Sequence, residues 1–239
     1  KVLRHILPHL PLQYNTYYEP FVGSGALFLK IEPKKWVIND LNKDIYKIWK
    51  YVQKDPQPFI DFFQDFDSKV KNYTHEQKLD YCKNLTESLN HLPFNLYRTV
   101  LYLLLINIVY SGSLIKHNKY YFSSFYVTGS NDLRTSKKVN LTNSTYTKNL
   151  MTISKFLKNG KIYNQDYKKI LDQTVKDDFV YLDPPYFEEK NYRFNYNRDE
   201  RIDSSFIDDL LLECKKMDKK GVKWMMSQAD TLEIREKFK

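Results

Sequence analysis

Hydrophobic positions in the first fifty residues alternate between short buried stretches and helical repeats. Apolar and aromatic residues at 16–21 end at a glycine turn over 23–25, a pattern typical of a buried strand. A helix is expected over 26–31, a second strand over 36–38 and a second helix over 41–52, where apolar residues recur at helical spacing. The order strand, helix, strand, helix is the usual opening of a parallel α/β sheet.

The same alternation returns in the last third of the chain. Strands are expected over 161–164, 178–182 and 222–227, and an amphipathic helix is expected over 204–217. These segments extend the α/β pattern of the first fifty residues, so both ends of the chain are predicted to build one core.

The middle of the chain, residues 53–156, shows no such alternation. Residues 59–89 are polar and helical in character, and residues 95–109 have the pattern of a strongly apolar helix. The aromatic stretch 119–128 is expected to form a hairpin, and a polar, basic segment follows over 133–149. We therefore expect a mainly helical subdomain inserted into the α/β core.

Positive charge is concentrated in and just after this insertion. The net charge is +9 and the isoelectric point is about 9.2, yet residues 111–165 alone hold nine Lys or Arg and one acid, Asp132. A localised positive field is what a polyanion-binding surface needs, because protein contacts to phosphates release condensed counterions. A solvated basic surface without a partner is the alternative.

The overall composition is that of an intracellular globular protein. Hydrophobic residues make up 42% of the 239 positions, and the two cysteines, Cys82 and Cys214, argue against a disulfide framework. We recognise no signal peptide, and the longest apolar run, residues 100–110, is interrupted by Asn107 and too short to span a bilayer. A cytoplasmic protein without a membrane segment is expected.

The first strand leads into a turn that suits a ligand. A glycine turn between a strand and a helix brings backbone N–H groups close to a bound molecule. The turn lacks the Gly-Lys-Ser/Thr of a P-loop and the full glycine spacing of a dinucleotide motif, which disfavours both of those sites. An ordinary tight turn is the alternative. The segment consists of Glu19, Pro20, Phe21, Val22, Gly23, Ser24 and Gly25.

An acidic residue follows the second strand. Asp40, after Asn39, stands where an acidic side chain can accept both hydroxyls of a ribose in nucleotide-binding α/β folds. The alternative is that Asp40 caps the helix expected from residue 41.

The sharpest chemical signal follows the strand over 178–182. The sequence there is Asp183, Pro184, Pro185 and Tyr186, and two prolines restrict the backbone. Such a turn can aim the Asp183 carboxylate and the Pro184 carbonyl at one point. Both are acceptors for the hydrogens of an exocyclic amine, and Tyr186 offers a face on which a base can stack. A rigid turn that only ends a strand is the alternative.

Together these segments resemble the Dam-type, site-specific N6-adenine DNA methyltransferases. Residues 18–27 look like that family's S-adenosylmethionine motif, and residues 37–42 look like its ribose motif. Residues 162–167 are similar to the segment whose acid contacts the cofactor adenine, and residues 180–186 to the catalytic motif. Residues 221–227 resemble the next strand of the family's sheet, and the motifs follow the family's order.

The resemblance implies a Rossmann-like methyltransferase sheet in residues 1–52 and 157–239, with residues 53–156 as a target-recognition subdomain that binds double-stranded DNA. The residues implied to hold S-adenosylmethionine are Lys1, Glu19, Pro20, Phe21, Gly23, Ser24, Gly25, Asp40, Asp166 and Tyr167. Those implied to hold the target adenine are Asp183, Pro184, Pro185 and Tyr186. Those implied to contact DNA are Lys116, Asn118, Lys119, Tyr121, Arg134, Lys137 and Lys138.

The chain departs from the family pattern in two places. Its recognition hairpin has Lys116 and Asn118 but lacks the family's usual Arg and Pro, so the common GATC target is not implied. The chain also ends soon after the strand over 222–227, where the family usually continues, so a C-terminal piece is expected to be missing.

These features lead to a mechanistic hypothesis in which an adenine is flipped out of the duplex and its amine attacks the methyl donor. No metal is expected, because His5 and His9 have helical spacing without a third ligand nearby. A monomer or weak dimer is expected. Restriction-modification is the expected setting, although the sequence does not show a partner restriction enzyme. An RNA or protein N-methyltransferase is one alternative, and a DNA-binding protein that keeps the fold without activity is another.

Overall fold

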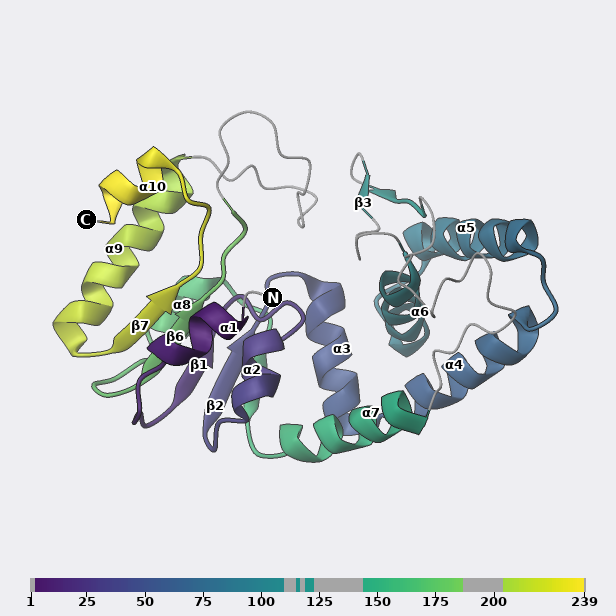
Figure 1. Cartoon of the computed structure of the whole chain (residues 1–239), viewed down its shortest axis with the longest axis horizontal. Helices are drawn as coiled ribbons and strands as arrows, with labels where there is room; N and C mark the ends of the chain where they lie inside the picture. Colours follow the sequence, from purple (N-terminus) through teal and green to yellow (C-terminus); the bar gives the residue numbers. More distant parts are fainter. Residues whose placement is uncertain (1–2, 110–114, 117–118, 123–143, 187–203, 239) are drawn as a thin grey trace. The chain divides into compact units, whose positions relative to one another are not determined.

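The structure is a computed structural model that describes residues 3–109, 115–116, 119–122, 144–186 and 204–238. The chain divides into two compact units (Figure 1). The first unit comprises residues 1–46, 159–195 and 200–239, and the second comprises residues 47–158 and 196–199.

The first unit is built on a five-stranded parallel sheet with the strand order β5-β2-β1-β6-β7. In register, Tyr18 lies opposite Val37 on one side and opposite Val180 on the other. From β1, the next strands along the chain, β2 and β5, are added on one side of β1. The later strands β6 and β7 are added on its other side, so the strand order reverses between β1 and β6. The strands are β1 (Tyr17–Glu19), β2 (Trp36–Asn39), β5 (Lys161–Tyr163), β6 (Phe179–Leu182) and β7 (Lys223–Met226).

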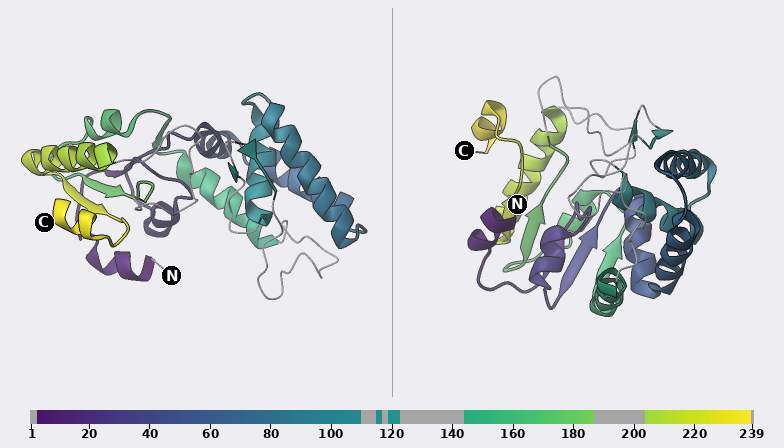
Figure 2. Two further views of the ribbon diagram at one scale, coloured as in Figure 1. Left: turned by 90° about the horizontal axis from the view of Figure 1, so that it is seen from above. Right: turned by 45° about the vertical axis from the view of Figure 1, so that its right-hand side comes forward.

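Helices cover both faces of this sheet, as Figure 2 shows from above. On one face, α8 (Tyr167–Leu171) and α9 (Ser204–Lys220) join Tyr18 and Val180 in one buried hydrophobic cluster. On the other face, Phe28 of α2 (Ala26–Ile31) stacks on Tyr17 with ring centroids 6.2 Å apart. That face also carries α1 (Leu3–Ile6) and the 3₁₀ helix Leu7–His9. Helix α10 (Leu232–Lys237) contacts α9 through an ion pair between Lys237 and Asp208. The predicted α/β fold class is confirmed.

The second unit contains the helices α4 (Gln57–Val70), α5 (His75–His91), α6 (Leu96–Ile108) and α7 (Ser144–Leu157). Residues 59–89 form two helices, because Thr74 starts α5 with a capping box: its hydroxyl accepts the Gln77 N–H and its own N–H bonds the Gln77 side chain. The predicted apolar helix is α6, which begins after Asn95, whose side chain caps the Arg98 N–H at 2.9 Å. The helix α3 (Lys43–Lys54) contains the boundary between the units.

The structure differs from the predictions at several element boundaries. The hairpin predicted over 119–128 starts earlier, since β3 (Ile115–Lys116) pairs antiparallel with β4 (Lys119–Tyr120); residues 123–128 lie outside the described part. The short helices α8 and α10 are not predicted from the sequence. None of the helices among the described residues is long and apolar enough to cross a membrane.

Candidate functional site

The loops that follow β1 and β6 lie at the same edge of the sheet, because the two strands are parallel neighbours. Glu19 ends β1, and Asp183 comes directly after Leu182, the last residue of β6. This is the position where the strand order reverses, and open α/β sheets bind their ligands in the crevice at such a point. The two strongest motifs of the sequence are therefore brought together.

The glycine turn after β1 is held by backbone hydrogen bonds. The Val22 N–H donates to the carbonyl of Asn39 at 2.9 Å, and the Gly25 N–H donates to the carbonyl of Val22 at 2.6 Å. Gly23 and Gly25 have positive φ angles of 47° and 65°, a backbone region that favours glycine. A Cβ built on Gly23 meets no atom within 4 Å, so open space adjoins the turn.

Asp40 links this turn to the loop that follows β2. Its Oδ2 accepts the Gly23 N–H at 2.9 Å, and its Oδ1 accepts the Asn42 N–H at 2.8 Å. The cap of α3 is Asn42, whose Oδ1 accepts the Asp44 N–H at 2.9 Å, so the alternative of Asp40 as the helix cap is wrong. Burial raises the pKa of Asp40 to about 6, and its two backbone hydrogen bonds lower it.

Glu19 is the most deeply buried acid of the site, with 2% of its surface exposed. Its pKa is raised to about 8: burial is the largest cause, a hydrogen bond from Tyr17 opposes it, and the nearby charges of Asp183 and Asp40 add to it. The charges of Asp183 and Asp40 thus both act on Glu19 at one edge of the sheet.

The residues after β6 combine a rigid backbone with an accessible aromatic ring. Pro184 is buried and Pro185 is half-buried, whereas Tyr186 is 49% exposed. Asp183 keeps an exposed side chain, yet loss of water to the surrounding protein raises its pKa to about 6, while a hydrogen bond with Tyr186 lowers it. An ionisable acceptor and a flat ring are therefore both available at this corner.

Asn39 has a role that the sequence analysis missed. It is 1% exposed, and its Nδ2 donates to the carbonyls of Pro20 at 2.9 Å and Gln165 at 3.0 Å. Its Oδ1 accepts the Gln165 N–H at 2.9 Å. One amide thus joins the end of β2 to the loops that follow β1 and β5. An amide at the end of a buried strand, directly before the acid Asp40, is the sequence signal that could have found it.

The remaining predicted cofactor residues lie after β5 and in the glycine turn. Asp166 is exposed and caps α8, accepting the Lys168 N–H at 2.8 Å. Tyr167 is buried, and its ring centroid lies 5.2 Å from that of Phe21 and 5.7 Å from that of Phe206. Phe206 of α9 is not predicted from the sequence. Pro20 is buried, Ser24 is exposed, and Lys1 lies outside the described residues.

Of the predicted DNA-contacting residues, Lys119 and Tyr121 are exposed in and after β4. Lys116 belongs to β3, whereas Asn118, Arg134, Lys137 and Lys138 lie outside the described residues. The sequence left open whether the aromatic residues here are core residues. Tyr120 and Phe122 are core residues, with 7% and 1% of their surface exposed.

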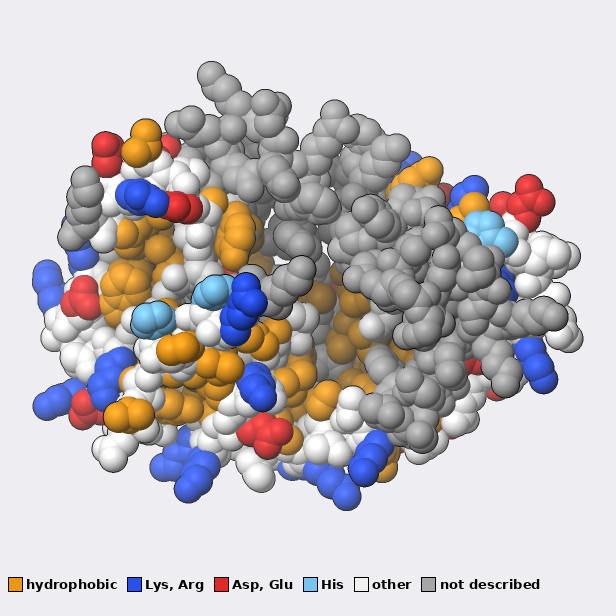
Figure 3. Space-filling view, viewed as in Figure 1, with side chains coloured by type: hydrophobic (Ala, Val, Ile, Leu, Met, Phe, Trp, Pro, Cys, Tyr) orange, Lys and Arg blue, Asp and Glu red, His pale blue; other side chains and the backbone are white. Residues whose placement is uncertain are grey.

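Within the described part of the chain, no three His, Cys, Asp or Glu residues gather in a way that could hold a metal ion. On the face of the first unit seen in Figure 3, Lys and Arg side chains are scattered.

Comparison with known proteins decides the family. Residues 1–239 match the sequence model of a family described as D12 class N6 adenine-specific DNA methyltransferase. The chain belongs to this family. The predicted activity, methylation of DNA at the N6 of adenine, is thereby confirmed.

Named relatives of this D12 class methyltransferase agree with that conclusion. The chain is 27% identical over 250 residues to the type II methyltransferase M1.LlaDCHI of Lactococcus lactis subsp. cremoris, covering 99% of this chain and 81% of the relative. It is 26% identical over 243 residues to the type II methyltransferase M.MjaIII of Methanocaldococcus jannaschii, covering 96% and 80%. A DNA adenine methylase of Haemophilus influenzae is 24% identical over 181 residues, covering 74% and 56%.

Proposed function

We propose that this methyltransferase transfers the methyl group of S-adenosylmethionine to the N6 of an adenine that is flipped out of duplex DNA. One observation carries the proposal: the glycine turn after β1 and the Asp183–Tyr186 corner after β6 follow neighbouring parallel strands at the reversal point of the sheet. A donor site and an acceptor site on these two loops would share one crevice.

The charge of the site suits S-adenosylmethionine, which supplies an electrophilic methyl group on a positively charged sulfur. Glu19, Asp40 and Asp183 all have raised pKa values, so each ionised carboxylate gains stability from a cation bound nearby. Open space beside Gly23 leaves room for a ligand against the turn. The residues proposed to hold the cofactor are Glu19, Pro20, Phe21, Gly23, Ser24, Gly25, Asp40, Asp166 and Tyr167.

Asp183, Pro184 and Tyr186 are proposed to hold the target base. The Asp183 carboxylate and the Pro184 carbonyl would each accept one hydrogen of the adenine amine, and this increases electron density on the nitrogen. Tyr186 would stack on the base and offset part of the few kcal/mol that flipping costs. Alignment and electrostatics would supply most of the rate, without a covalent intermediate on the protein.

The second unit is proposed to bind the duplex. Its basic segment would contact phosphates, and its hairpin would present Lys119 and Tyr121 to the DNA. The other residues proposed for this surface are Lys116, Asn118, Arg134, Lys137 and Lys138.

Replacing Asp183 tests the proposal. Asp183→Asn keeps the size of the side chain but removes the charged acceptor, so kcat for methyl transfer to DNA should fall by about a hundredfold or more. Binding of S-adenosylmethionine, measured by calorimetry, should be largely kept. The matched control is Asp172→Asn, an exposed acid at the end of α8, which should retain wild-type turnover. Equal turnover in Asp183→Asn would refute the assignment of this corner.

A further inference from the structure

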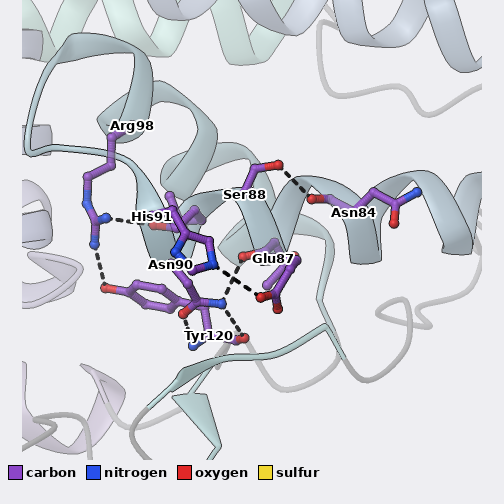
Figure 4. Close-up of polar contacts among 9 residues, drawn as sticks. Asn84, Glu87, Ser88, Asn90, His91, Arg98 and Tyr120 are labelled. Carbon is purple, nitrogen blue, oxygen red and sulfur yellow. Dashed lines mark hydrogen bonds and ion pairs between the residues drawn. The ribbon is translucent and has the colours of Figure 1, made fainter.

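A side-chain amide pairs with the backbone of the recognition hairpin. The Tyr120 N–H donates to Oδ1 of Asn90 at 2.9 Å, and Nδ2 of Asn90 donates to the Tyr120 carbonyl at 3.2 Å (Figure 4). In an antiparallel sheet, the N–H and the carbonyl of one residue are both hydrogen-bonded by a residue of the neighbouring strand. Here Asn90, on helix α5, takes the place of that strand.

Arg98 holds the helix end that carries Asn90. This guanidinium, on α6, is 4% exposed and donates to the carbonyls of Leu89 at 2.7 Å and Leu92 at 2.8 Å. Those carbonyls lie at the C-terminal end of α5, where cationic side chains stabilise a helix. The same guanidinium donates to the Tyr120 hydroxyl at 3.3 Å, so it bonds both the helix end and the hairpin (Figure 4).

Burial alternates along the strand that these contacts hold. Tyr120 and Phe122 are buried in the second unit, whereas Lys119 and Tyr121 are exposed. In a strand, a shift of one residue turns every side chain to the opposite face. Contacts that bond the backbone and the hydroxyl of Tyr120 therefore also determine that Lys119 and Tyr121 face outward.

We propose that Asn90 and Arg98 are positioning residues for DNA recognition. They hold Tyr120 in the one register that presents Lys119 and Tyr121 to duplex DNA, without touching the DNA themselves. This inference rests on the proposed function, in which the hairpin contacts DNA. It predicts a defect in DNA binding that is separate from cofactor binding and from the chemical step.

Three variants test the inference. Asn90→Ala removes both hydrogen bonds to the Tyr120 backbone, and Tyr120→Phe removes only the hydroxyl that accepts from Arg98. Asn84→Ala is the matched control, because Asn84 lies on the same helix with an exposed side chain (Figure 4). Arg98 itself is left intact, since removing a buried guanidinium that caps α5 risks unfolding the unit.

In Asn90→Ala, KM for DNA should rise about tenfold, as expected from the loss of two hydrogen bonds. The rise in Tyr120→Phe should be smaller, about threefold. The kcat at saturating DNA and the Kd for S-adenosylmethionine should match the wild type, and so should every parameter of Asn84→Ala. Hydrogen exchange of the Tyr120 amide should be faster in Asn90→Ala alone.

Two results would overturn the inference while leaving the proposed function in place. One is a wild-type KM for DNA in both Asn90→Ala and Tyr120→Phe. The other is a fall in kcat and in melting temperature that accompanies the rise in KM in both variants, which would mean that the contacts only stabilise the unit. If the wild-type chain itself neither bound nor methylated DNA, the proposed function would fail, and the inference with it.

Discussion

The hydroxyl of Tyr17 donates a hydrogen bond to Oε2 of Glu19 at 2.5 Å, two residues further along the same strand. Side chains at positions i and i+2 of a strand share one face, so the pair lies on one side of β1. Both residues are almost fully removed from solvent. The bond lowers the pKa of Glu19, but burial raises it more, and the net pKa is about 8.

Glu19 should therefore make the ligand-free enzyme less stable as the pH rises. The folded protein binds more protons at this residue than the unfolded chain between its ordinary pKa of 4.5 and about 8, so the unfolding free energy falls across that window. In Glu19→Gln this pH-dependent decrease in unfolding free energy, roughly 3–5 kcal/mol in the wild type, should be absent. Urea unfolding at a series of pH values measures the decrease, and Glu236→Gln, a change at an exposed residue, is the control. The same pH slope from pH 6 to 8 in Glu19→Gln and the wild type would contradict the raised pKa.

In the proposed mechanism Asp183 must be ionised to accept a hydrogen from the target amine, so catalysis should fail in acid. The pKa of Asp183 is about 6, so kcat should decrease about tenfold per pH unit below that value and level off above it. Because the pKa of Asp40 is also about 6, saturating cofactor and DNA are needed at each pH. A rate that stays constant down to pH 5 would exclude an ionised Asp183 as the acceptor.

Asn39→Asp should loosen the carboxyl edge of the sheet. The change removes the donor that bonds the carbonyls of Pro20 and Gln165, and it places a carboxyl group at a position that is 1% exposed. We expect a loss of about 2–4 kcal/mol in unfolding free energy, together with weaker binding of S-adenosylmethionine. Asn164→Asp loses bonds to the carbonyls of Asp40 and Leu41 at a less buried site, so its effect should be smaller. Equal stability of Asn39→Asp and the wild type would contradict this role.

Gly160→Ala should destabilise the first unit, because a Cβ there would come within 2.2 Å of the buried Trp36 ring. Overpacking of this kind costs about 1–3 kcal/mol. Thermal unfolding measures the loss, and a double-mutant cycle with Trp36→Leu should recover part of it, since the smaller side chain leaves room. A purely additive cycle would mean that the ring is not the cause.

The sequence predicts the parts of this fold that are set by local pattern. The helix over 26–31 and the strand over 36–38 agree with α2 and β2 to within one residue, because their buried residues are close together in the chain. The five-residue helix α8 is too short to show a hydrophobic period, so it is not predicted.

The sequence predicts those site residues that belong to a short local motif. Motif spacing picks out Asp40 and Asp183, and parallel strands place both residues at the same edge of the sheet. The bonds from Asn39 to Gln165, and from Asn90 to Tyr120, join residues far apart in the chain, so a local pattern can at most point to the amide and not to its partner. Phe206 meets Tyr167 only after α9 has packed on the sheet.

The pairing of β2 with β5 bears on how the chain is assembled on the ribosome. Ile38 pairs with Ile162, and most of the second unit is encoded between these two residues. During synthesis, the free edge of β2 has no native partner until residues 161–163 have left the exit tunnel. We expect the inserted helices to fold first, leaving that edge open to wrong partners in the meantime. Slower translation after residue 163 would then favour correct closure of the sheet.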